Sequence, residues 1–105
     1  MNGLDLDLNS VSDTDSAHSA STWVIQNTQT RRQIKNLKMR FDASKVYSKE
    51  FLKAILNYKL VFLKKIYILA VEGCNQFTLE NLIMVLHDLD IDPRRLFLNG
   101  SELNA

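Results

Sequence analysis

The chain has 105 residues, enough for one domain with a small core but too few for two. A single cysteine excludes an internal disulfide framework and a cysteine-rich zinc site. The net charge of +1 hides an uneven distribution of charge along the chain. Residues 1–27 carry four acids and no base, residues 28–65 carry eleven bases and two acids, and residues 66–105 carry two bases and six acids. A basic middle segment attracts nucleic acid or an acidic protein.

The first part of the chain is acidic and rich in serine and threonine. Residues 1–22 alternate leucine with aspartate before the serines begin, and we expect this segment to bury too little apolar surface to offset its ordering entropy. The sequence therefore predicts a disordered acidic tail over residues 1–27 and one helical domain over residues 28–105. It shows no signal peptide, no membrane-spanning run and no internal repeat, so we expect an intracellular protein without a membrane partner.

A first helix is predicted from Thr28 or Thr30 to about Phe41. Ile34, Leu37 and Phe41 are spaced three and four positions apart, which places them on one face of a helix. Basic side chains occupy the remainder of the helix and the loop after it, and they are the candidates for contact with DNA phosphates. These candidates are Arg31, Arg32, Lys35, Lys38, Arg40 and Lys45. The alternative is a solvated helix face, or a face that pairs with an acidic protein.

The second predicted helix is the longest element. Ser48 caps it, Glu50 lies in its first turn, and neither proline nor glycine follows before Gly73. About 25 residues would form a rod of roughly 37 Å. Apolar residues surround the second half of this rod, and a helix that is apolar all round must be covered all round. Two short helices cannot supply that cover, so the sequence predicts a second protein chain against this helix.

Two further helices complete the predicted all-α fold. The first of them begins at Thr78 and continues to about Asp90, with its leucines on one side. Asp92 and Pro93 then mark the start of a short terminal helix that ends near Leu98.

The order short helix, long apolar helix, short helix over residues 28–98 resembles the histone fold. Tyr47-Ser48-Lys49-Glu50-Phe51 resembles the entry into the central helix of small non-nucleosomal histone-fold subunits, and Phe77-Thr78-Leu79-Glu80-Asn81-Leu82 resembles their entry into the third helix. Asp92-Pro93-Arg94-Arg95-Leu96-Phe97 is similar to a stretch in TBP-associated factors of TFIID. The resemblance implies a nuclear, non-enzymatic subunit that heterodimerises with another histone-fold chain in a transcription or chromatin complex. Its expected interface is Leu56, Leu60, Phe62, Leu63, Ile66, Leu69, Leu82 and Leu86.

Three alternatives remain open. The segment from Lys45-Val46 through the central helix also resembles the small histone-fold subunit of the kinetochore and the Fanconi complex, which implies a DNA-binding role in centromeres or repair. The closing helices resemble those of a bacterial helix-turn-helix regulator. A homodimeric helical adaptor is the third alternative.

Catalytic and metal chemistry have little support in the sequence. His87 with Asp88, Asp90 and Asp92 lacks the glycine and the final glutamate of a calcium loop. Cys74 has no basic neighbour in sequence that would lower its pKa, so a structural, half-buried cysteine is expected. We therefore expect no catalytic residue, no cofactor, no metal and no small-molecule substrate.

Overall fold

The computed structural model describes residues 3–27, 36–57, 68–91, 96–98 and 101–102, and it has an α/β fold. The predicted all-α class is therefore wrong. The elements in chain order are β1 (Gly3–Asp7), the 3-10 helix η1 (Leu8–Ser10), α1 (Ala17–Asn27), β2 (Asn36–Arg40), α2 (Lys49–Asn57), β3 (Ile68–Glu72), α3 (Gln76–Asp88), β4 (Leu96–Leu98) and β5 (Ser101–Glu102).

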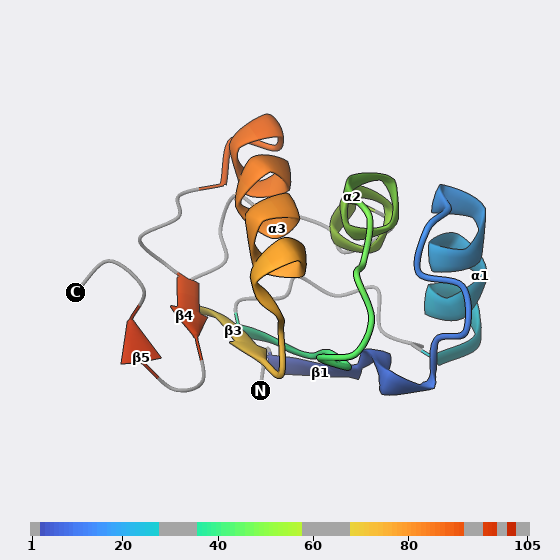
Figure 1. Cartoon of the computed structure of the whole chain (residues 1–105), viewed down its shortest axis with the longest axis horizontal. Helices are drawn as coiled ribbons and strands as arrows, with labels where there is room; N and C mark the ends of the chain where they lie inside the picture. Colours follow the sequence, from blue (N-terminus) through green and yellow to red (C-terminus); the bar gives the residue numbers. More distant parts are fainter. Residues whose placement is uncertain (1–2, 28–35, 58–67, 92–95, 99–100, 103–105) are drawn as a thin grey trace.

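The strands form one sheet in the order β1-β2-β3-β4-β5. The first four strands are parallel to their neighbours, and β5 pairs antiparallel with β4. Parallel neighbours require a return crossover, and such crossovers are almost always right-handed. Because the strand order follows the chain order, every crossover returns over the same side of the sheet. Figure 1 shows the result: α1, α2 and α3 lie together on one side, and the described helices leave the other face of the sheet open.

The strand register contains a repeat that the sequence analysis missed. Leu4, Leu37, Leu69 and Leu96 lie side by side in one row, and the first three are separated by 33 and 32 positions in the chain. The row two residues later contains Leu6, Met39, Val71 and Leu98. The molecule is thus built from similar strand–helix units, here called unit 1 (β1 and α1), unit 2 (β2 and α2) and unit 3 (β3 and α3). The expectation of no internal repeat was wrong.

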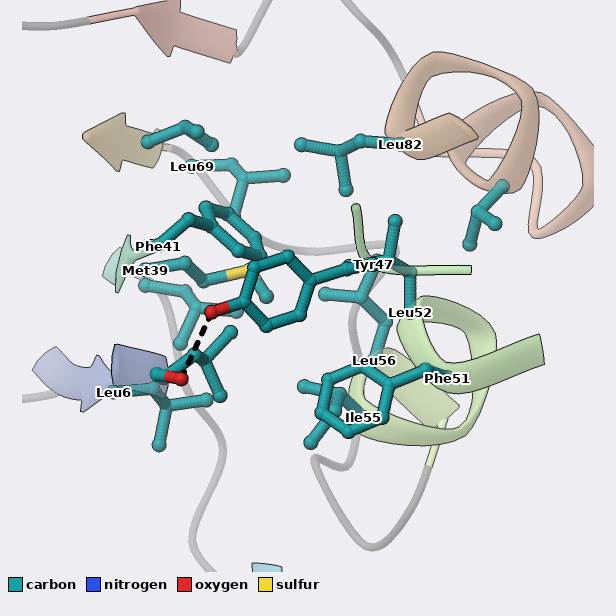
Figure 2. Close-up of a cluster of buried hydrophobic side chains, with 14 of the residues drawn as sticks. Leu6, Met39, Phe41, Tyr47, Phe51, Leu52, Ile55, Leu56, Leu69 and Leu82 are labelled. Carbon is teal, nitrogen blue, oxygen red and sulfur yellow. Dashed lines mark hydrogen bonds between the residues drawn. The ribbon is translucent and has the colours of Figure 1, made fainter. Parts of the chain in front are cut away.

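The core lies between the sheet and the helices. Side chains alternate across a strand, and in these two rows the side chains of Leu6, Leu37, Met39, Leu69 and Val71 are at most 2% exposed, beneath the helices. Tyr47 stands in the centre of this layer, between Phe41 of unit 2 and the leucines of α2 (Figure 2). Each large apolar side chain that is fully buried contributes about 1.5–3 kcal/mol. The buried apolar residues on the helices are Ala20, Phe51, Leu52, Ile55, Leu56, Leu82, Val85 and Leu86.

The two predicted helices that supported the histone resemblance are not present as predicted. The segment 36–40, placed in a basic helix, is strand β2, and residues 28–35 lie outside the described residues. The predicted helix from Ser48 to Gly73 ends as α2 at Asn57, and residues 68–72 form strand β3. Its middle part, residues 58–67, lies outside the described residues. Residues 68–72 are therefore not part of a continuous central helix, which the histone resemblance requires.

The ends of the chain also differ from the prediction. Residues 3–7 form strand β1 and residues 17–27 form α1, so the described part of the predicted tail belongs to the fold. Residues 96–98 form strand β4 in place of a terminal helix. The third predicted helix is confirmed as α3, but Asn75 caps it instead of Thr78. Ser48 caps α2 as predicted, because its hydroxyl accepts a hydrogen bond from the Phe51 amide at 3.1 Å.

Side-chain hydrogen bonds join consecutive units where the strands end. The Asn75 amide donates to the carbonyl oxygens of Ala43 at 2.9 Å and Lys45 at 2.8 Å, which links unit 3 to unit 2. The buried Tyr47 hydroxyl donates to the Leu8 carbonyl at 2.9 Å, which links unit 2 to unit 1. Backbone groups that enter the interior at these turns thereby find partners, as buried polar groups must.

Candidate interaction surface

The open face of the sheet carries the strand positions that alternate with the core positions. One row across the strands contains Asp5, Lys38 and Ala70, and the next contains Asp7, Arg40 and Glu72. We call these six residues the open face. Both aspartates are exposed, and the other four side chains are partly exposed. The helices lie on the opposite side of the sheet, so the alternation of a strand is what turns these six residues toward solvent.

Charge on the open face is arranged in columns that follow the strands. The β1 column is acidic, the β2 column is basic, and the β3 column has the small Ala70 followed by Glu72. Two ion pairs cross diagonally between the columns. Lys38 Nζ lies 3.0 Å from Glu72 Oε1, and Arg40 Nη2 lies 3.2 Å from Asp5 Oδ2. The four side chains are 41–49% exposed, so solvent screens both pairs, and each contributes at most about 1 kcal/mol.

The carboxylate of Asp7 belongs to the open face and to the turn that follows β1. Its Oδ1 accepts hydrogen bonds from the Asn9 side-chain amide at 2.8 Å and from the Asn9 backbone amide at 3.1 Å. These two bonds, with a smaller effect of the Arg40 charge, hold the pKa of Asp7 below its ordinary value. Asp7 therefore takes up a proton only at a lower pH than an ordinary aspartate does.

The predicted DNA contacts separate into three groups in the structure. Lys38 and Arg40 lie on the open face, where carboxylates are paired with both of them. Lys45 lies in the turn after β2, where its Nζ donates to the carbonyl oxygens of Asn9 and Val11 at 3.4 and 2.8 Å and lies 3.8 Å from Asp42 Oδ2. Arg31, Arg32 and Lys35 lie outside the described residues. The structure therefore does not bring the described members of this set together as a uniformly basic patch.

The predicted partner interface separates in a similar way. Leu56, Leu69, Leu82 and Leu86 are at most 1% exposed and pack inside the core of this chain. Their burial requires no second protein. Leu60, Phe62, Leu63 and Ile66 lie outside the described residues.

The described residues contain two further features of chemical interest. A hollow of about 720 Å³ lies beside α3 and is lined by Lys49, Ile83, Met84, His87, Asp88, Asp90 and Ile91. Cys74 is half-buried, and burial raises the pKa of its thiol from 9.0 to about 11, so the thiol is protonated near neutral pH. Within the described ranges no group of three or more histidine, cysteine or acidic residues is placed to hold a metal ion. No helix in this part of the chain is long and apolar enough to cross a membrane.

Two of the six open-face residues, Lys38 and Arg40, are among the contact residues predicted from the sequence, and the other four are not. A usable signal was present in Leu4-Asp5-Leu6-Asp7-Leu8, where apolar and acidic residues alternate with the period of a half-buried strand. The carboxylates of Asp5 and Asp7 then belong to the solvent face of that strand. Comparisons with protein-family models, with curated proteins and with solved structures give no match.

Proposed function

We propose that this chain is a non-catalytic, protein-binding scaffold of strand–helix units, and that its binding surface is the open face. The observation that carries the proposal is the register, which aligns charged side chains of three strands on the one face that the described helices leave uncovered. A partner that lies on this face contacts three units at once.

The repeat supports the proposal. Residues 1–9, 34–42 and 66–74 share the pattern apolar-x-x-apolar-x-apolar, and the third position after it is occupied by Asn9, Asp42 and Cys74. Leucine-rich repeats are built from a strand with this pattern, followed by a helix in the segment that leads back to the next strand. Such arrays stack their units side by side and present one continuous surface, which they use for binding.

The sign of the charges favours a protein partner over nucleic acid. The open face has three carboxylates, on Asp5, Asp7 and Glu72, against two bases, on Lys38 and Arg40. Phosphate binding requires an excess of positive charge. DNA binding through the six predicted basic residues stays a prediction, and nuclear location followed only from the histone resemblance and is not part of the proposal.

The experiment replaces single residues with a photo-crosslinking amino acid in the full chain. Ala70 is the test position, because it belongs to the open face, lies on the middle strand of the sheet and is next to Lys38 in the register. Lys53, an exposed residue of α2, is the matched control on the helix side. A protein captured through Ala70 is identified and purified, and its affinity is then measured for the chain and for the Lys38→Glu/Arg40→Glu variant.

We expect crosslinks from Ala70 and not from Lys53, and an affinity that falls at least about tenfold on charge reversal. Lys53→Glu should leave the affinity unchanged. Crosslinking from Lys53 in place of Ala70, or an unchanged affinity of the reversed variant, would overturn the proposal.

A further inference from the structure

Asp7, Arg40 and Glu72 form a single row across β1, β2 and β3, in the order acid, base, acid. Neighbouring strands in a sheet are about 4.8 Å apart, so the three backbone positions of the row span about 9.6 Å. The row therefore presents alternating charge to any group that crosses the strands. A partner segment that lies parallel to one strand meets charges of a single sign on that strand and charges of the opposite sign on the neighbouring strand.

Each member of the row keeps capacity for a further contact. Asp7 accepts both hydrogen bonds from Asn9 at Oδ1, and no described residue donates a hydrogen bond to its Oδ2. Glu72 meets Lys38 through Oε1. The Arg40 guanidinium donates to Asp5 through Nη2, while its buried Nε finds no acceptor among the described residues. A guanidinium has five donors, so this contact leaves room for a second carboxylate.

The spacing of the row distinguishes between two kinds of partner segment. An extended segment turns every second residue toward the sheet, at intervals of about 6.8 Å, which does not match the strand spacing. An α-helix turns residues i, i+3 and i+7 to one side, at intervals of about 4.5 and 6.0 Å. Its total of about 10.5 Å is close to the span of the row.

We propose that the partner of the open face is an α-helix that lies across the strands and presents a base, an acid and a base at positions i, i+3 and i+7. The first base lies over Asp7, the acid over Arg40 and the second base over Glu72. This inference rests on the proposed function, because it names the element of the partner protein that meets the open face.

The probes are two capped, alanine-rich helical peptides of about 18 residues. One has Lys, Glu and Lys at positions i, i+3 and i+7, and the other has Glu, Lys and Glu there. Each is titrated at low salt into the full chain and into the Asp7→Lys/Arg40→Glu/Glu72→Lys variant, in which the row is reversed. Amide chemical shifts of β1, β2 and β3 report the affinity and the place of binding, and circular dichroism confirms that the variant is folded.

The unmodified chain should bind the Lys-Glu-Lys peptide roughly fivefold or more tightly than the other, because exposed ion pairs are individually weak but three act together. The reversed variant should prefer the Glu-Lys-Glu peptide. Glu80→Lys, an exposed change on α3, serves as the control and should leave the original preference intact. If Asp7→Lys disturbs the turn at Asn9, the Arg40→Glu/Glu72→Lys variant makes the same test.

Equal affinity for the two peptides, binding of neither, or a preference that persists in the reversed variant would overturn the inference. The two proposals fail separately. A partner that crosslinks from Ala70 while the peptides show no preference leaves the proposed function in place and removes only the crossing helix. Absence of crosslinking from Ala70 removes the binding face itself.

Discussion

Gly73 lies so close to the backbone carbonyl of Phe41 that a β-carbon at residue 73 would overlap the Phe41 oxygen. Gly73 also has φ of +72°, in the left-handed region that residues with a β-carbon rarely adopt. Next to this contact, the Phe41 amide donates to the Glu72 carbonyl at 2.8 Å. Units 2 and 3 thus meet, backbone to backbone, at a position where only glycine fits.

Replacement of Gly73 by alanine should therefore destabilise the protein. The left-handed conformation alone costs about 1–2 kcal/mol, and relief of the overlap with Phe41 adds to that cost. Chemical denaturation, followed by circular dichroism, measures the free energy of unfolding. The control is Gln76→Ala, an exposed change on the same turn, which should stay within about 0.5 kcal/mol of the unmodified chain. A Gly73→Ala variant as stable as this control would contradict the contact.

Asn75 has two separable roles, and two substitutions distinguish them. Its Oδ1 caps α3 by accepting from the Thr78 amide at 2.9 Å, while its Nδ2 donates to the Ala43 and Lys45 carbonyls. Asn75→Ala removes both roles and should cost about 2–3 kcal/mol. Asn75→Asp keeps an oxygen for the cap but loses both donors.

We expect Asn75→Asp to be about as destabilised as Asn75→Ala, because the two lost hydrogen bonds to unit 2 contribute more to stability than the cap that aspartate keeps. Denaturation curves of the two variants, measured together near neutral pH, make the comparison. An aspartate variant with the stability of the unmodified chain would show that capping is the only role of this side chain.

The third helix and the Ser48 cap were predictable because their signals are local. The spacing of Leu79, Leu82 and Leu86 fits a helix and does not fit a strand. A serine before a charged first turn marks the start of a helix.

Strand β3 was not predictable from its own pattern. Residues 68–71 are part of a continuous apolar run. The sequence of such a run does not distinguish a strand of a parallel sheet from a segment of a buried helix. Strand β2 was ambiguous for another reason. Leu37 and Phe41 fit a helical spacing, yet Leu37, Met39 and Phe41 also alternate as in a strand.

The open face was hidden because it depends on pairing between distant segments. Asp5, Lys38 and Ala70 are far apart in the chain, and only the strand register places them in one row. The leucine pairs 4/6, 37/39 and 69/71 recur at nearly constant intervals, with Met39 and Val71 replacing leucine at the second position. These replacements, and the different lengths of the segments that connect one strand to the next, obscured the repeat.

Asp90 lies two residues beyond the end of α3 and has an unfavourable backbone conformation that glycine would relieve. Its φ is +58°, and the hydrogen bonds from the Asp90 amide to the His87 carbonyl and from the Ile91 amide to the Leu86 carbonyl define a Schellman turn. Asp90→Gly should stabilise the protein by about 1 kcal/mol, because glycine has no β-carbon to oppose a positive φ. Thermal unfolding measures the gain. Asp88→Gly, two residues earlier at the last residue of α3, is the control and should destabilise the protein, by up to about 1 kcal/mol.

The thiol of Cys74 should make the protein less stable in alkaline solution. Burial raises its pKa in the folded chain from 9.0 to about 11, so between these values the folded state holds a proton that the unfolded state has released. The stabilising contribution is therefore complete below about pH 9 and is lost as the pH rises toward 11. Burial also raises the pKa of Tyr47, so this tyrosine adds a loss that starts near pH 10. Cys74→Ala removes the thiol and leaves Tyr47, so the free energy of unfolding of this variant should fall less steeply between about pH 9 and 10. Parallel stability curves for the two proteins over this range would show that Cys74 is not desolvated in the fold.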